Sequence, residues 1–88
     1  MPTALEIAEW MLDELTRSGE LYQETAVSHI AMKFGYEFTY DNENGNLAIR
    51  RDVLATFRRL TKDSVVWERE DRCWRKRKME DKPTKQQD

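Results

Sequence analysis

Cysteine, glycine, proline and long apolar runs are all scarce in this sequence of 88 residues. The single cysteine, Cys73, excludes an internal disulfide and a zinc site built from several cysteines, so we expect a reducing, cytoplasmic location. No run approaches about eighteen apolar residues, and the N-terminus has no basic segment followed by an apolar one. We therefore expect no contact with a membrane and no secretory signal.

Leu, Ile, Val and Phe are also sparse, at 17 of the 88 residues. Disordered chains share that low apolar content, but they usually carry a large net charge, whereas this chain carries −2. Three Trp, three Tyr and four Met add apolar volume. We expect one small domain over residues 3–78, with a thin core rich in aromatic side chains, and a flexible polar tail over residues 79–88.

The small net charge hides an uneven distribution. Residues 1–46 carry nine acids and two bases, a balance of −7, whereas residues 47–88 carry thirteen bases and eight acids, a balance of +5. Such a split predicts an acidic surface and a basic surface on one small body. The basic surface can attract nucleic acid or an acidic protein, or the two halves can simply complement each other.

The first predicted helix runs over Ala4–Ser18. Apolar residues recur there at helical spacing, and acidic residues occupy the opposite face. Thr3 and Glu6 have the spacing of a capping box, which indicates that the helix begins after Thr3. Gly19 follows as a natural C-terminal stop.

Two more helices are predicted further along. A short extended segment at 20–22 precedes the second helix, which runs over Gln23–Phe34 and is stopped by Gly35. The third helix begins between residues 46 and 50 and ends near Thr61.

The segment between these helices has an alternating aromatic pattern, carried by Tyr36, Phe38 and Tyr40. That alternation is typical of a strand, and it would place all three rings on one face. Asn44-Gly45 is a turn signal, so a small hairpin between 36–42 and 46–49 stays open as an alternative.

Residues 65–76 predict a β-hairpin with Arg69–Arg72 at its tip. In that register Trp67 lies directly opposite Trp74, and such a pair stabilises a two-stranded ribbon. The predicted core consists of Leu5, Ala8, Leu12, Leu15, Ile30, Phe34, Val53, Phe57, Leu60, Val66 and Trp67.

This order of elements is that of an α+β domain of the winged helix-turn-helix type, with three helices and a C-terminal β-hairpin wing. The link between the second and third helices is about ten residues, longer than the three or four of a tight helix-turn-helix. Four segments carry a closer resemblance: Leu21–Thr25, Asn42–Ile49, Val65–Glu68 and Cys73–Arg77. They resemble a family of small, uncharacterised bacterial proteins with a winged helix-turn-helix-like fold, over about residues 5–78. The resemblance implies the fold and a bacterial origin, and it brings no activity with it.

DNA binding is the first functional hypothesis, because winged helices generally place the third helix in the major groove and the wing on the backbone. The cations expected on the third helix are Arg50, Arg51, Arg58, Arg59 and Lys62, and those of the hairpin are Arg69, Arg72, Arg75, Lys76 and Arg77. Arginine suits phosphate and guanine because its planar fork donates two parallel hydrogen bonds. A pI of about 5.5 and the acids of the wing weigh against this hypothesis.

The alternative is a winged-helix module for protein–protein interaction or dimerisation, without DNA binding. The acidic first helix and the basic third helix could pair between copies, with Trp10 and Met32 as interface anchors. The other interpretation of the tryptophans is that their side chains fill the core of the domain.

We expect no enzyme activity, cofactor or small-molecule substrate. His29, the single histidine, lies on the polar side of its helix with no partner that the sequence assigns. Arginines near Cys73 could lower the pKa of its thiol, but no base or oxyanion site accompanies it. The loop at 41–52 resembles a calcium loop only faintly, since its glycine comes one residue early and an aspartate replaces the closing glutamate. We therefore predict no metal site.

Overall fold

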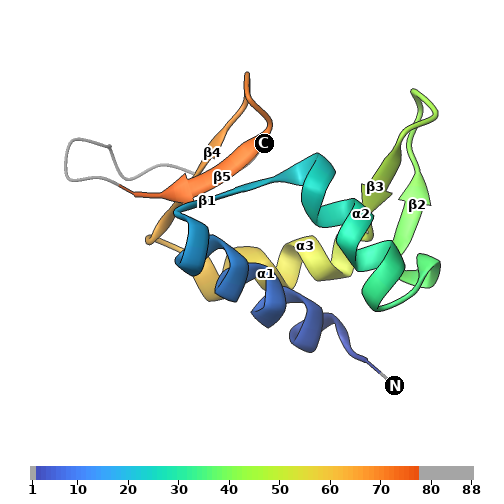
Figure 1. Ribbon diagram of the computed structural model, residues 1–88, viewed down its shortest axis with the longest axis horizontal. Helices are drawn as coiled ribbons and strands as arrows, with labels where there is room; N and C mark the ends of the chain where they lie inside the picture. The colour runs from blue at the N-terminus through green and yellow to red at the C-terminus, as the bar shows by residue number, and fades with distance from the viewer. Residues whose placement is uncertain (1, 78–88) are drawn as a thin grey trace.

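A computed structural model describes residues 2–77, so the tail expected at 79–88 lies outside the described residues. The chain folds as a small α+β arrangement of three α-helices, a short 3₁₀ helix and antiparallel strands (Figure 1). In chain order the elements are α1 (Ala4–Ser18), β1 (Glu20–Tyr22), α2 (Gln23–Lys33), η1 (Tyr36–Phe38), β2 (Thr39–Asp41), β3 (Leu47–Ile49), α3 (Arg51–Thr61), β4 (Val65–Glu68) and β5 (Cys73–Lys76). Within this part of the chain, every helix is too short or too polar to cross a membrane.

Local capping fixes both ends of α1, as predicted. The Thr3 hydroxyl accepts a hydrogen bond from the Glu6 N–H at 3.2 Å, which satisfies one of the free donors of the first turn. At the other end Gly19 has φ of 87°, and its N–H donates to the Leu15 carbonyl at 2.7 Å. A side chain would strain that left-handed backbone, so a glycine ends the helix.

A three-stranded antiparallel sheet in the order β1-β5-β4 joins the two halves of the chain. The predicted hairpin is confirmed, with Trp67 directly opposite Trp74. Leu21 of β1 lies on the other side of Trp74, a pairing that the sequence analysis did not predict. β1 therefore joins the β4–β5 hairpin to the segment between α1 and α2.

The core lies between this sheet and the packed pair α1 and α3. Trp74 is fully buried at its centre, and the Phe57 ring meets the indole edge-on at 5.2 Å. Several predicted core residues are confirmed as buried: Ala8, Leu15, Ile30, Val53 and Phe57. Leu12, Phe34 and Trp67 are half-buried against that core.

Three of the predicted core residues are wrong. Leu5 and Leu60 are 48% and 38% exposed. Leu5 lies about 100° around α1 from the centre of the buried stripe, and Leu60 lies in the last turn of α3. Val66 is only half-buried, whereas Val65 is buried. Neighbouring strand residues point to opposite faces, so Val66 and Trp67 cannot both face the core.

The strand predicted through Tyr36, Phe38 and Tyr40 is also wrong. Tyr36–Phe38 forms a 3₁₀ helix after Gly35, whose φ is 119°. Phe38 is buried, but Tyr36 is 69% exposed and Tyr40 is 38% exposed. The 3₁₀ turn destroys the period of two, so the three rings do not share a face.

The hairpin left open as an alternative does form, in the shorter version of β2 and β3. Asn42 holds its turn, because its side-chain oxygen accepts hydrogen bonds from the N–H groups of Asn44 and Asn46 at 2.9 and 3.0 Å. This hairpin occupies residues that the sequence analysis gave to the start of the third helix. Ile49 is fully buried as the last residue of β3, and α3 begins at Arg51, one residue after the expected window.

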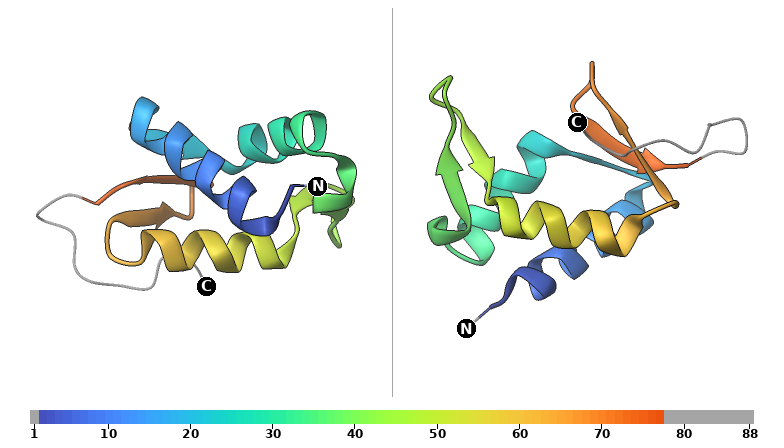
Figure 2. Two further views of the ribbon diagram at one scale, coloured as in Figure 1. Left: turned by 90° about the horizontal axis from the view of Figure 1, so that it is seen from below. Right: turned by 180° about the vertical axis from the view of Figure 1, so that it is seen from behind.

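The connection between α2 and α3 is therefore residues 34–50, and not a link of about ten residues. α2 packs mainly on β3 and η1, while α3 packs on α1. Both hairpins rise on the same side of α3, one at each of its ends (Figures 1 and 2). One side of α3 is thus covered by α1 and by the core beneath the sheet.

Candidate nucleic-acid interface

The exposed side of α3 carries a line of cations, which we call the basic ridge. Its cations are Arg51, Arg58, Arg59 and Lys62, and Ala55 lies between them; all five residues are exposed. They lie opposite Val53 and Phe57, whose side chains are fully buried against α1 and the sheet. At about 1.5 Å per residue, the ridge extends about 16 Å from its first residue to its last. The amphipathic pattern of the helix therefore produces a convex, positively charged surface with a small side chain in the middle.

Arg50 does not belong to this ridge, although the sequence analysis placed it there. It precedes the helix as its N-cap residue, and its guanidinium binds both oxygens of Asp52 at 2.7 and 2.8 Å. The same group donates to the Glu37 carbonyl at 3.0 Å and lies 4.6 Å from the centre of the Phe38 ring. Arg50 therefore joins the start of α3 to η1, and its charge is already matched.

Asp52 is the one carboxylate within α3. The hydrogen bond from Arg50 lowers the pKa of this carboxyl, and the positive charge of Arg50 adds to the effect. Its oxygen also accepts the Val53 N–H at 2.9 Å. The acid that interrupts the sequence of the helix is thus paired with Arg50, so it does not cancel the charge of the ridge.

The β4–β5 hairpin, which the sequence analysis predicted as a wing, contributes less charge than predicted. Arg69 and Arg72 are exposed at its tip, but so are Glu70 and Asp71, so the tip is neutral in sum. Arg75 is half-buried on β5, and its guanidinium binds the Glu68 carboxylate at 2.8 Å across the hairpin.

The wing tip is attached to the body through its backbone. Arg72 has φ of 53°, and its carbonyl accepts the N–H of Gln23, the first residue of α2, at 2.9 Å. A cleft of about 400 Å³ lies beside this contact, lined by residues of α2, the wing tip and the β2–β3 hairpin. The sequence analysis missed it because its walls come from three distant segments.

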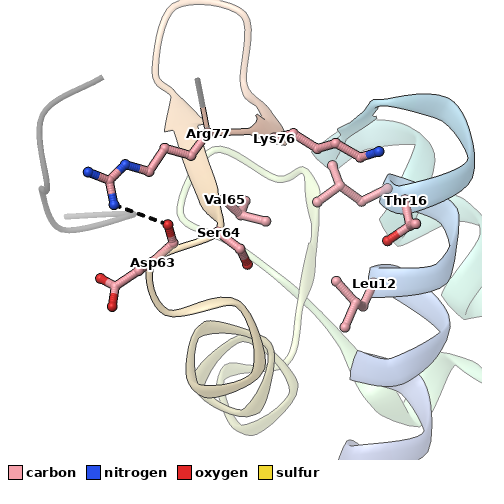
Figure 3. A pocket seen from close by; sticks show the side chains of 8 residues that line it. Leu12, Thr16, Asp63, Ser64, Val65, Lys76 and Arg77 are labelled. Atoms are coloured by element: carbon pink, nitrogen blue, oxygen red, sulfur yellow. Dashed lines mark hydrogen bonds between the residues drawn. The ribbon is translucent and has the colours of Figure 1, made fainter. Parts of the chain in front are cut away.

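Lys76 and Arg77 lie at the base of the wing, at a second hollow that the sequence analysis also missed. It measures about 490 Å³, and Leu12, Leu15 and Val65 supply its apolar lining (Figure 3). The Lys76 side chain extends over the hollow toward α1 (Figure 3). Arg77 points away and donates to the Asp63 carbonyl at 3.2 Å. We call this cavity the α1–β4 hollow.

The two predicted interface anchors differ in their surroundings. Trp10 is half-buried, and its ring lies 5.9 Å from the rings of both Phe34 and His29. It closes the gap between α1 and α2, which favours the core interpretation of this tryptophan. Met32, by contrast, is 82% exposed on α2.

Cys73 lies at the start of β5 and is buried. Burial raises the pKa of its thiol, and the negative charges of Glu20 and Asp71 add to the rise. Arg75 lowers the pKa by less than burial and the acids raise it, so the net effect of the surroundings is a raised pKa. Within residues 2–77, no three His, Cys, Asp or Glu side chains are grouped so that they could hold a metal ion.

Comparisons with known proteins assign the sequence to a family but give no activity for it. No curated protein and no solved structure matches the chain. Residues 3–76 match the sequence profile of a family described only as a family of unknown function, DUF6953. The match covers most of the chain, from the cap of α1 to the last residue of β5. The chain therefore belongs to the family of unknown function DUF6953.

Proposed function

We propose that this protein is a winged-helix-like domain that binds nucleic acid, and DNA in particular, through the basic ridge of α3. The observation that carries the proposal is the ridge itself: four exposed cations on one helix face, while the carboxylate within α3, Asp52, is paired with Arg50. Phosphate contacts by such cations supply most of the affinity of non-specific binding.

The dimensions of α3 support the major groove as its site. That groove is about 12 Å wide and admits an α-helix, whereas the minor groove is too narrow. The ridge residues face away from α1, so a duplex can reach them without displacing the core. Arg51 and Arg59 suit base edges and phosphates because a guanidinium donates in pairs.

The wing has a smaller part in this proposal than in the sequence analysis. Arg69 and Arg72 can reach the backbone beside the helix, but Glu70 and Asp71 repel the same phosphates. Arg75 is bound to Glu68, so we assign it to the hairpin and not to DNA. The long α2–α3 connection also departs from a helix-turn-helix, and the fold assignment rests on the order of elements and the wing.

Protein–protein interaction is the second candidate, and the observation in its favour is the exposure of Met32 and Tyr36. These side chains are 82% and 69% exposed on neighbouring turns of α2 and η1. Exposed apolar side chains that form one contiguous patch indicate a contact surface, and these two lie four residues apart in the chain. The two candidates predict different salt dependence, because apolar docking does not release counterions.

The proposal is tested by the anisotropy of labelled, random-sequence duplex DNA at about 50 mM and about 200 mM salt. We expect binding that weakens steeply with salt. The variant Arg51→Gln/Arg59→Gln removes two ridge charges and should reduce the slope of log K against log salt by about two.

The matched control is Arg17→Gln/Lys33→Gln, which removes the same charge from α1 and α2. This variant should bind like the native protein, apart from a small long-range effect. Equal losses in both variants would reduce the effect to net charge and contradict a role for the ridge. No binding at the lower salt would shift the proposal to protein interaction, and Met32→Ser would then be the first variant to examine.

A further inference from the structure

β4 forms an edge of the three-stranded sheet, since the strand order is β1-β5-β4. Within residues 2–77, the backbone–backbone hydrogen bonds of Val65–Glu68 go to β5, and none of these residues pairs with a strand on the other side of β4. Natural edge strands are usually protected by lysine, proline or a bulge. β4 reads Val-Val-Trp-Glu, and its one charged side chain, Glu68, is bound to Arg75 of the same hairpin, so Val65–Trp67 form a short apolar edge that can pair with another strand.

We infer that two copies of this chain pair through β4, in antiparallel orientation, about a two-fold axis at Val66. A two-fold axis perpendicular to the sheet leaves each side chain on the same face of the combined sheet. Residues that lie opposite each other must therefore both have odd numbers or both have even numbers, because side chains alternate between the two faces. Centring the axis on Val66 places Val66 opposite itself and Val65 opposite Trp67 of the second copy. Centring it on Trp67 would instead place Val66 opposite Glu68. The first register pairs only apolar residues at its centre and is therefore favoured.

The same register places the indole of Trp67 beside Val65 of the second copy. Trp67 is half-buried and lies on the inner face of the sheet, where its ring is 4.8 Å from that of Trp74. In the pair, Trp67 of the second copy lies beside Val65, which lines the α1–β4 hollow. Leu12 supplies the opposite apolar wall of that hollow (Figure 3). Each copy thus contributes the same Trp67–Val65 pairing, as a two-fold interface requires.

The test uses the position that lies opposite itself. Sedimentation equilibrium of the native chain should show a monomer–dimer equilibrium in the micromolar range, because the short edge buries less than about 1,200 Å². Val66→Lys and Val66→Glu each place like charges opposite each other and should weaken the dimer about fivefold or more. An equimolar mixture of the two variants should restore it as a heterodimer.

The matched control is the pair Thr25→Lys and Thr25→Glu, exposed on α2, which makes the same charge changes away from the edge. Both should dimerise like the native chain, and mixing them should change nothing. Far-UV circular dichroism verifies that each variant is folded. A native chain that stays monomeric overturns the inference. So does a dimer that the Val66 variants leave intact, or one that their mixture fails to restore.

Discussion

At the residue scale, the most informative side chain is one that the sequence analysis assigned to DNA. Arg50 binds Asp52, the Glu37 carbonyl and the face of Phe38, and so holds the start of α3 against η1. A run of two arginines in the sequence thus contains one that stabilises the fold and one, Arg51, that is exposed. Spacing could not separate them, because the difference depends on a carbonyl thirteen positions earlier in the chain.

Asp52→Asn tests this clamp through its pH dependence. The pKa of Asp52 is lowered by Arg50 in the folded protein, so the ionised carboxylate stabilises the fold above its unfolded pKa of about 3.9. That contribution is lost as the pH falls through the lower, folded value. We expect Asp52→Asn to melt below the native protein at pH 7, and the gap to close in acid.

Thermal unfolding followed by circular dichroism, from about pH 7 down to about pH 2, measures that gap. Asp13→Asn on α1 removes the same charge away from Arg50 and serves as the control. A gap for Asp52→Asn that stays constant to the lowest pH would show that the pair with Arg50 does not stabilise the fold.

At the element scale, local signals fix the ends of α1. The Thr3 hydroxyl accepts a hydrogen bond from the Glu6 N–H, three residues away, and the Gly19 N–H donates to the Leu15 carbonyl, four residues away. Such short-range interactions do not depend on the rest of the fold, so the predicted bounds of α1 are confirmed. The start of α3 has no side-chain cap of this kind, and its predicted start was wrong.

Gly19→Ala is the corresponding prediction. The Gly19 backbone has φ of 87°, which strains any residue with a Cβ, although nothing lies within 4 Å of the added carbon. We expect a loss of about 1 kcal/mol in the free energy of unfolding, caused by the backbone alone. Urea unfolding followed by tryptophan fluorescence measures it. Ser18→Ala, one residue earlier within α1, should change stability little, and an equal loss there would contradict the role of the left-handed backbone.

At the scale of the whole molecule, the unequal charge of the two halves becomes a difference between surfaces. Among residues 2–77, α1 and α2 expose Glu6, Glu9, Asp13 and Glu24, while the exposed cations of the second half lie on or next to α3 and on the β4–β5 hairpin. One aromatic contact holds these layers together, where Phe57 of α3 meets Trp74 of the sheet beneath α1.

Phe57→Ala should therefore destabilise the entire domain. Loss of a fully buried phenylalanine costs about 3–5 kcal/mol, a large part of the 5–15 kcal/mol typical of a whole domain. Urea unfolding by tryptophan fluorescence should show a midpoint far below that of the native protein. Phe34→Ala, at a half-buried position between α1 and α2, should cost clearly less. Equal losses would argue against a core centred on Phe57.

Across these scales, the sequence by itself determined the α+β class, the bounds of α1 and the pairing of Trp67 with Trp74. These features depend on helix caps, on glycines that end helices and on the alternation of apolar and polar residues in strands. All three signals act over a few residues. Only the tertiary structure decided that Phe38 is buried while Tyr36 is exposed, and that β1 pairs with β5. It also separated Arg50 from the basic ridge and assembled the α1–β4 hollow. Those outcomes require contacts between distant segments, and the periodicity of one segment carries no information about what packs against it.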